Sequence, residues 1–406
     1  MRRRLLLISV TAVAGGGLAC VAAAGSTTPS RAGRPAPTRQ ARSAKPVLKS
    51  SNPAAAVTAF GIDLMARIGG TGNIVFSPYS VASVVAMAGA GASGRTATQI
   101  ARVLDLRSPT QIAGIGRLSG TLAREQSAAS AGAADPPQLD LANGLFVERS
   151  FPLLPAFTAT LTTGFGAPPQ PVDFETDAAG ATQAINQFVS SHTAGVIPPI
   201  LGPGQLDAST RLALVNAIYL KAAWKDPFPA AATATRTFVA PGGRRPVPFM
   251  TETDSLAYAK GSGYQAVELP YANSTFALLV LKPAHTEAAL QKRVTPGLIA
   301  RAQAGLRPAT VALSMPRFHI SLQANLDSEL EQLGMTAAFS PGSADFSGIS
   351  PTPLYVSFVQ HDADFTVDEQ GTIATAATVG GISATALELP PRPTARSTST
   401  GRSRST

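Results

Sequence analysis

The segment that decides the fold reads Asp368-Glu-Gln-Gly371-Thr-Ile-Ala-Thr-Ala-Ala-Thr378-Val-Gly380. After Glu369 it carries neither a charged nor an aromatic residue, which is unusual for a solvated loop. Small side chains recur at alternate positions, as in a strand with little side-chain volume: Thr372, Ala374, Ala376 and Thr378. Such a segment predicts a strand that can slide between two existing strands, where its backbone groups find partners. A disordered Ala/Thr linker is the alternative that composition leaves open.

Two other predicted strands each place a polar residue among apolar ones. Between 359 and 367, His361 falls in the apolar phase, and between 212 and 220, Asn216 does the same. A buried amide or imidazole without a partner costs about 1 to 3 kcal/mol. We therefore expect these two side chains to pair with each other or with the hydroxyls of Ser77 and Ser80. They form either an ordinary satisfied core pair or a polar latch in a sheet that must open.

Elsewhere the predicted helices and strands do not follow the regular strand–helix alternation of a doubly wound sheet. Ser77 before Pro78 predicts a helix start, because the hydroxyl caps a free amide and proline has no amide to satisfy. Residues 325–334 predict a short helix that Gly334 ends. Alternation predicts further strands at 264–269, 276–281 and 311–315. The sequence therefore predicts a mixed α+β domain.

Composition and charge exclude several classes of protein. The chain has 406 residues, 45% hydrophobic and 14% charged, which suits a globular domain with a large core. The net charge of +9 belongs to the ends, since residues 1–52 carry nine Lys or Arg and 391–406 carry four, without any acid. Residues 53–390 hold 20 bases against 24 acids. Nucleic-acid binding needs basic residues gathered on a folded face, so we do not expect it.

The N-terminal residues have the pattern of an export signal. Three arginines precede an apolar run from Leu5 to Ala14, and small residues follow, which predicts a signal peptide at 1–24 and a secreted protein. Cys20, the only cysteine, sits in a sequence that resembles a lipoprotein cleavage box and offers a possible lipid anchor. Residues 25–52, rich in Ser, Pro, Ala and Arg, read as a disordered linker. Cleavage leaves no disulfide, so stability must come from packing.

Several motifs, in the correct order, resemble the serpin family over residues 53 to 387. They are Asn73-Ile-Val-Phe-Ser77-Pro78-Tyr-Ser80, Asn216-Ala-Ile-Tyr-Leu-Lys221-Ala-Ala-Trp224 with Phe228, Pro316-Arg-Phe318, Leu333-Gly334-Met335, Asp345-Phe-Ser-Gly348, and the segment from Asp368 to Thr378. The resemblance implies a serpin fold with a large central mixed β-sheet, two smaller sheets and about eight or nine helices. It places the domain at 53–390, with a reactive loop at about 371–390.

The resemblance also implies a function, inhibition of a serine protease by a suicide-substrate mechanism. The protease cleaves an exposed loop, the loop inserts into the central sheet, and the acyl-enzyme is trapped. The implied sites are a sheet-opening region at Ser77, Ser80, Asn216 and His361, a loop-entry region at Trp224, and a hinge at Glu369, Gly371, Thr372, Ala374, Ala376, Ala377 and Thr378. The family usually has Glu where this chain has Ile373, but the small hinge residues are kept.

Counting about fourteen residues on from Gly371 puts the reactive bond near Thr385-Ala386. Between 368 and 391 there is no Lys or Arg, so a trypsin-like target is not expected. The sequence favours an elastase-like or subtilisin-like serine protease that accepts small or apolar residues. We expect a bacterial, secreted, monomeric inhibitor that is not an enzyme and needs no cofactor or metal.

The chain departs from the family after Leu389. A serpin continues into a buried apolar hairpin of the second sheet, whereas residues 391–406 are Arg, Ser and Thr rich and read as a disordered basic tail. We therefore expect the C-terminal hairpin of the second sheet to be absent, leaving unpaired strand edges and a less stable protein. An inactive serpin-like protein that is cleaved as a substrate is the alternative function.

An enzyme is the alternative from another class. Gly89-Ala-Gly91-Ala-Ser-Gly94 has a dinucleotide-binding spacing, but it follows a helical pattern and lacks an acid about 20 residues on. No Gly-x-Ser-x-Gly elbow and no His-Glu-x-x-His helix occurs. His192, His285 and His319 have no carboxylate or cysteine at ligand spacing, so the sequence predicts no metal site.

Overall fold

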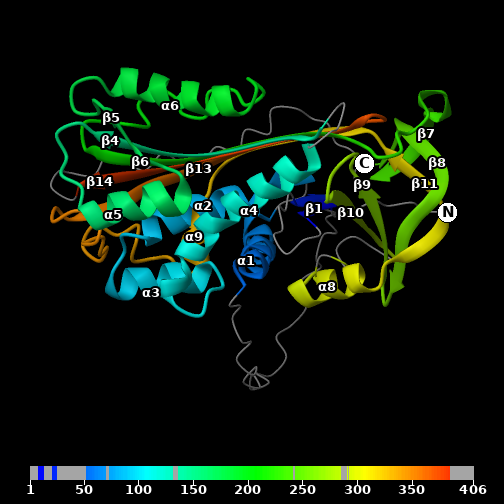
Figure 1. Cartoon of the computed structure of the whole chain (residues 1–406), viewed down its shortest axis with the longest axis horizontal. Coiled ribbons are helices and arrows are strands. Elements are labelled where there is room, and N and C mark those ends of the chain that lie inside the picture. Colours follow the sequence, from blue (N-terminus) through cyan, green and yellow to red (C-terminus); the bar gives the residue numbers. More distant parts are fainter. Residues whose placement is uncertain are drawn as a thin grey trace.

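The computed structural model describes residues 8–12, 21–24, 52–69, 73–130, 136–240, 243–284, 290 and 292–384. These residues form two β-sheets with helices packed around them (Figure 1). The predicted signal peptide cleavage point, the linker at 25–52 except Asn52, the bond Thr385-Ala386 and the tail at 391–406 lie outside the described residues.

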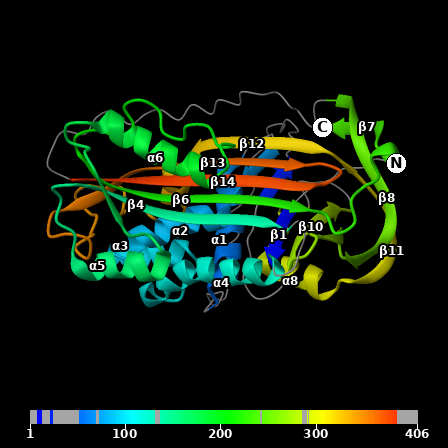
Figure 2. The same cartoon turned by 45° about the horizontal axis from the view of Figure 1, so that its top comes forward.

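The central sheet has six strands in the order β12-β13-β14-β6-β4-β5. Their bounds are β12 (Phe318–Asn325), β13 (Leu354–Val367), β14 (Gly371–Ala384), β6 (Thr210–Ala223), β4 (Gln138–Glu148) and β5 (Pro169–Val172). Only β4 and β5 run parallel, so the sheet is mixed as predicted. The small-residue segment is β14, and it lies between β13 and β6 (Figure 2). The expected exposed loop is thus a central strand over most of its length.

The second sheet has eight strands, in the order β11-β8-β9-β10-β1-β2-β3 with β7 paired to β8. Their bounds are β11 (Arg307–Pro316), β8 (Gly243–Gly261), β9 (Tyr264–Pro270), β10 (Phe276–Pro283), β1 (Ile8–Ala12), β2 (Val21–Ala24), β3 (Asn73–Phe76) and β7 (Ala234–Ala240). Two smaller sheets were expected, but β8 is 19 residues long and joins them. Its residues 243–249 pair with β7 and its residues 257–261 pair with β9, while β11 pairs with the middle part, residues 249–258.

The N-terminal residues supply two strands of this second sheet. β1 pairs with β10 from Ile8↔Val280 to Ala12↔Phe276, and β2 pairs with β3 from Val21↔Phe76 to Ala24↔Asn73. The prediction that the missing C-terminal hairpin leaves unpaired edges on this sheet is therefore wrong for β10 and β3. A segment that reads as an export signal has the apolar, uncharged run that a strand pair also needs, so composition does not separate the two roles.

Eight α-helices occur within the described residues. They are α1 (Pro53–Ile68), α2 (Pro78–Gly89), α3 (Gly94–Val103), α4 (Ala113–Ser130), α5 (Pro155–Thr160), α6 (Ala178–His192), α8 (Pro296–Ala304) and α9 (Asp327–Leu333). As predicted, Ser77 caps α2, with its Oγ accepting from Ser80 N at 3.2 Å, and Pro78 is the first helical residue. Gly334 ends α9 with φ 115°, a conformation that favours glycine.

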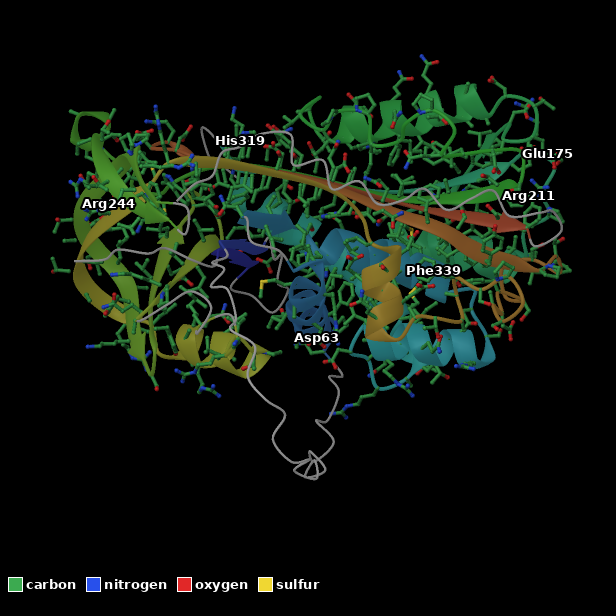
Figure 3. All side chains as sticks on the ribbon, turned by 180° about the vertical axis from the view of Figure 1, so that it is seen from behind. Asp63, Glu175, Arg211, Arg244, His319 and Phe339 are labelled. Atoms are coloured by element: carbon green, nitrogen blue, oxygen red, sulfur yellow. The ribbon has the colours of Figure 1, made fainter. Side chains whose placement is uncertain are left out.

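The helices cover both faces of the central sheet. All 12 residues of α2 are buried, and the helix lies under β14 and β6 in the main hydrophobic core. On the other face α6 covers a second core that contains Ile185, Val189, Ala377 and Val379 (Figure 1). Arg211 of β6 and Glu175 are joined by an ion pair of 3.3 Å at one end of the sheet (Figure 3). The center of the sheet is thus enclosed from above and below.

The pairing of β1 with β10 predicts a role for the N-terminal segment in stability. Changing both Val10 and Thr11 to Pro removes two consecutive backbone N–H donors, which point to opposite sides of a strand, so at least one ladder bond is lost. We expect the thermal midpoint of the full chain to fall by a few degrees or more. Ala44→Pro, outside both strands, is the control. A midpoint equal to that of the parent chain would show that the pairing contributes nothing.

Candidate functional site

The inserted strand β14 is bonded along both edges and covered on both faces. It pairs with β13 from Val367↔Thr372 to Leu354↔Ala384 and with β6 from Gly371↔Ala223 to Thr210↔Ser383. Ala374 and Ala376 face the main core and are at most 3% exposed. Ala377 and Val379 face the core under α6 and are fully buried. Small side chains are required here because both neighbouring layers are already in place.

Two glycines permit the closest approaches along this strand. A Cβ atom at Gly371 would lie 2.2 Å from the carbonyl oxygen of Ala222, which is backbone and cannot move aside. A Cβ atom at Gly381 would lie 2.3 Å from the ring of Phe358. Gly371 is therefore needed where the chain enters the sheet, as the hinge assignment implies.

A tight turn at 368–371 connects β13 to β14 and contains Glu369 and Gly371, the first two residues of the expected hinge. Asp368 Oδ1 accepts from Gln370 N at 2.9 Å and from Gly371 N at 3.1 Å. Trp224 binds this turn, because its indole Nε1 donates to Asp368 O and its backbone N donates to Gln370 O, at 2.9 and 2.8 Å. Trp224, the expected loop-entry residue, is therefore in direct contact with the turn that begins the expected hinge.

Glu369 is anchored on the outer side of the hinge. Thr233 Oγ1 donates to Glu369 Oε1 at 2.7 Å, and Arg317 Nη1 lies 3.8 Å from Oε2. The hydrogen bond from Thr233, with the Arg317 charge as a smaller contribution, lowers the pKa of the Glu369 carboxyl. Phe228 N also donates to Glu369 O at 2.9 Å. The anchoring residues Thr233 and Arg317 were not identified from the sequence, because they contact the hinge only through the fold.

Tyr271 is a further site residue that sequence reasoning missed. Its ring stacks on Trp224 with centroids 4.8 Å apart, and its hydroxyl donates to Thr372 Oγ1 at 2.8 Å. The position follows β9 and precedes a turn, where a tyrosine gives no signal of its own. Tyr271 thus connects the second sheet to the first residue of β14 after the hinge glycine.

A row of four polar residues crosses the middle of the central sheet at one level. The register places His361 of β13 opposite Thr378 of β14, Thr378 opposite Asn216 of β6, and Asn216 opposite Asn143 of β4. Three of them, His361, Thr378 and Asn216, are fully buried. Their alignment depends on β14, because the inserted strand separates His361 from Asn216.

The hydrogen bonds of His361 determine which of its ring nitrogens carries a proton. Ser77 N donates to His361 Nε2 at 3.2 Å, so the ring proton is on Nδ1, which donates to Thr378 Oγ1 at 2.7 Å. Burial lowers the pKa of His361 to about 4, so the ring is neutral. The prediction that His361 is buried is confirmed by its position, but the expected partner was wrong. The partner is Thr378, because β14 occupies the space between His361 and Asn216.

Asn216 has one satisfied and one unsatisfied end. Its Nδ2 donates to Asn143 Oδ1 at 2.9 Å, and Asn143 Nδ2 in turn donates to Phe165 O at 2.8 Å. Asn216 Oδ1 is buried without a hydrogen-bond partner. Ser80 Oγ donates to Ser77 Oγ at 3.0 Å, so it is not the partner of Asn216 or of His361. Asn216 therefore keeps an acceptor that no donor fills while β14 is in the sheet.

The face of β13 opposite to His361 also carries a buried polar residue. Asp362, the next residue along the strand, is only 1% exposed. Its carboxylate accepts from Gln323 Nε2 at 2.8 Å and from Gln360 Nε2 at 3.0 Å. Burial nevertheless raises the pKa of Asp362 to about 6. Next to it on the same face, Asp364 is hydrogen-bonded to His319 of β12, which lies near the surface (Figure 3).

Metal and membrane features were also sought among the described residues. Within these ranges no cluster of three or more His, Cys, Asp or Glu residues is arranged to hold a metal ion. None of the described helices combines the length and the apolar character that crossing a membrane requires.

Comparison with known proteins gives one consistent result. A family model described as serpin (serine protease inhibitor) matches residues 55–396. Plasminogen activator inhibitor 1 from Bos taurus is 33% identical over 344 residues, which cover 82% of this chain and 84% of the relative. Leukocyte elastase inhibitor from Xenopus tropicalis is 33% identical over 348 residues, which cover 81% of this chain and 89% of the relative.

Solved structures show the same similarity. Ovalbumin from emu (Dromaius novaehollandiae) matches with a TM-score of 0.76 and 26% identity, covering 84% of this chain and 92% of that one. Cleaved Serpin 42Da matches with a TM-score of 0.73 and 32% identity, covering 81% and 89%.

The polar row predicts unequal effects for two threonines of β14. Thr378→Val removes the acceptor of the His361 proton and leaves a buried donor unpaired, so we expect the free energy of unfolding to fall by about 1 to 3 kcal/mol. Thr375→Val is the matched control, because the Thr375 hydroxyl is buried without a partner and its loss costs nothing. Urea unfolding monitored by circular dichroism measures both. Equal effects would contradict the assigned bond.

The neutral state of His361 predicts a pH dependence. The unfolded ring has a pKa of 6.5 and the folded ring about 4, so between these values the unfolded chain binds more protons. Stability is therefore complete above pH 6.5 and is lost as the pH falls toward 4, by roughly 3 kcal/mol. His361→Gln keeps both hydrogen-bonding functions but does not titrate, so it should flatten this part of the curve.

The measurement is the unfolding free energy of parent and variant between pH 7.5 and 4.5. Asp362, whose pKa is about 6, and Glu252, whose pKa burial raises to about 7, change stability in the opposite direction. They are present in both proteins and cancel in the difference. His192→Gln, at a half-buried position on α6, is the control. Parallel curves for parent and His361→Gln would refute the assignment.

Proposed function

The chain belongs to the serpin family, and on this premise we propose that it inhibits a serine protease as a suicide substrate. The protease cleaves the segment after β14, the cut segment enters the central sheet as β14, and the protease is carried along before deacylation is complete. The family is one of serine protease inhibitors, and the relatives with inhibitor names support an inhibitor more than an enzyme.

The observation that carries this proposal is the fit of β14 to the sheet. Twelve of the fourteen residues of Gly371–Ala384, namely 372–383, pair on both sides with few irregularities, and every residue between Gly371 and Ser383 except Ile373 is buried. A segment that is to enter an existing sheet must be accommodated without moving either covering layer, and small residues satisfy this need. The fit of β14 therefore supports insertion as the step that brings the inhibitor to its final state.

The polar row supports a control of sheet opening. Without β14, strands β13 and β6 would be neighbours at about 4.8 Å. His361 Nδ1 would then lose Thr378 and face Asn216 Oδ1, the acceptor that is now unfilled. We infer that a hydrogen bond from His361 to Asn216 holds β13 and β6 together before insertion. When β14 enters, His361 gives up Asn216 and donates to Thr378 instead. Ser77 holds the ring throughout, because its N–H binds the opposite ring nitrogen.

The inserted length supports the position of the reactive bond. The partner strands β13 and β6 begin at Leu354 and Thr210, which stand opposite Ala384 and Ser383, and the proposed bond Thr385-Ala386 comes directly after these positions in the sequence. A cut at this bond would release a segment of the length that the sheet takes up. The absence of Lys and Arg between 368 and 391 favours an elastase-like or subtilisin-like protease over a trypsin-like one.

A second candidate function is a serpin that does not inhibit. The observation in its favour is that β14 occupies the sheet in the uncut, continuous chain. A chain that reaches this state before it meets a protease cannot trap one, and a chain that is cut without fast insertion is only a substrate. The expected loss of the C-terminal strands also favours this alternative, although the family match runs on to residue 396.

We further propose that the protein is exported by residues 1–24 and acts as a monomer outside the cell, with Cys20 as a possible site of lipid attachment. Cleavage at 24 would also remove β1 and β2 from the second sheet. The stability of the full chain and of the processed chain should therefore differ, as the prediction for Val10 and Thr11 also implies.

Incubation with elastase, subtilisin and trypsin followed by SDS electrophoresis tests the function directly. A complex that survives SDS supports trapping, whereas complete cleavage without a complex supports the substrate alternative. Mass spectrometry of the released peptide locates the cut. Cleavage by trypsin alone, outside 380–390, would refute the proposed specificity.

Substitutions at two neighbouring positions of β14 can distinguish a failure of insertion from a failure of cleavage. Ala374→Arg places a long charged side chain at a buried position that faces the core, so we expect at least a tenfold loss of the SDS-resistant complex with cleavage retained. Ile373→Arg is the matched control, because Ile373 is half-buried and points to the other face. Equal loss at both positions would show that burial in the sheet is not what the complex requires.

A further inference from the structure

A cavity of about 170 Å³ lies apart from the central sheet, where β7, β8, β9, β10 and β11 come together (Figure 1). Its buried wall is apolar and consists of Phe238, Phe249, Ala266, Val267 and Val280. The rings of Phe238 and Phe249 lie 6.1 Å apart and are tilted by 31°. The cavity is comparable in size to an apolar protein cavity of about 150 Å³ that binds benzene, so it has room for one ring.

The rim of this cavity is polar and partly open to solvent. Lys282, Gln265, Tyr258 and Ser314 are half-buried and line it, and Ala312 at its mouth is exposed. Lys282 Nζ donates to Gln265 Oε1 at 3.4 Å, a long bond that leaves two ammonium protons for another acceptor. Lys282 is the one charged side chain in the lining.

The charge of Lys282 is not neutralised by the described part of the chain. None of the ion pairs formed by described residues includes it. The acids on the neighbouring strands, Glu268 of β9 and Glu252 and Asp254 of β8, do not line the cavity. An anion at the rim would therefore meet a cation whose position is already restricted by Gln265.

We propose that this cavity binds a small aromatic monocarboxylate, with the ring between Phe238, Val267 and Val280 and the carboxylate at Lys282. The ring supplies van der Waals contacts that the residues around the empty cavity lack. The carboxylate forms a charge-assisted hydrogen bond to the ammonium group of Lys282. The site is separate from β14 and its hinge, so the proposal does not rest on the inhibitor function.

Benzoate is the probe, and methyl NMR of the full chain is the measurement. We expect saturable shifts of the Val267, Val280 and Leu313 methyl groups, with benzoate binding about tenfold more tightly than benzyl alcohol, which keeps the ring without the charge. Lys282→Met should remove this tenfold preference. Lys292→Met, at an exposed lysine outside the lining, is the control and should keep it.

Ala312→Phe tests the location. Because Ala312 is exposed, the substitution can block the mouth without disturbing the core, and it should abolish the benzoate shifts. Shifts that do not saturate, that persist in Ala312→Phe, or that are equal for benzoate and benzyl alcohol in the parent chain would each overturn the proposal. A cavity already filled by a segment outside the described residues would give no shifts and would overturn it as well.

Discussion

A strand in the middle of an enclosed sheet can carry only side chains that fit between two fixed layers, and this constraint governs the molecule. α2 lies directly under β14 and α6 above it, and β13 and β6 occupy both edges. Alanine, threonine and glycine occupy nine of the eleven positions at 371–381 and meet this limit. The hinge, the polar row and the second sheet are arranged around this one strand.

The hinge shows how the second sheet takes part in the placement of β14. Trp224 stacks on Tyr271, and both bind residues of the entering chain, the indole at Asp368 and the phenol at Thr372. Tyr271 N also donates to Phe276 O at the start of β10. A change in the strands next to β10 can therefore be transmitted to the hinge through contacts between neighbouring residues.

Much of this arrangement could be predicted from the sequence, because it depends on local patterns. The start of α2 at Ser77-Pro78, the stop of α9 at Gly334 and the strand period of 372–378 are all local properties. The burial of His361 followed from alternation, but its partner did not, since Thr378 reaches it only when β14 is in the sheet. Tyr271, Thr233 and Asn143 could not be found, because their roles arise from contacts between strands distant in sequence. The strands at Ile8–Ala12 and Val21–Ala24 were missed because an apolar run near an arginine cluster fits an export signal equally well.

The two-sided enclosure of β14 sets a limit on how often the molecule can act. A protease needs an extended, accessible backbone, and a strand that is hydrogen-bonded along both edges cannot be drawn into an active-site cleft. Recognition by any protease must therefore come before the segment is seated. Under the proposed mechanism, each molecule can therefore trap one protease at most, and only during the time that residues 371–384 lie outside the sheet.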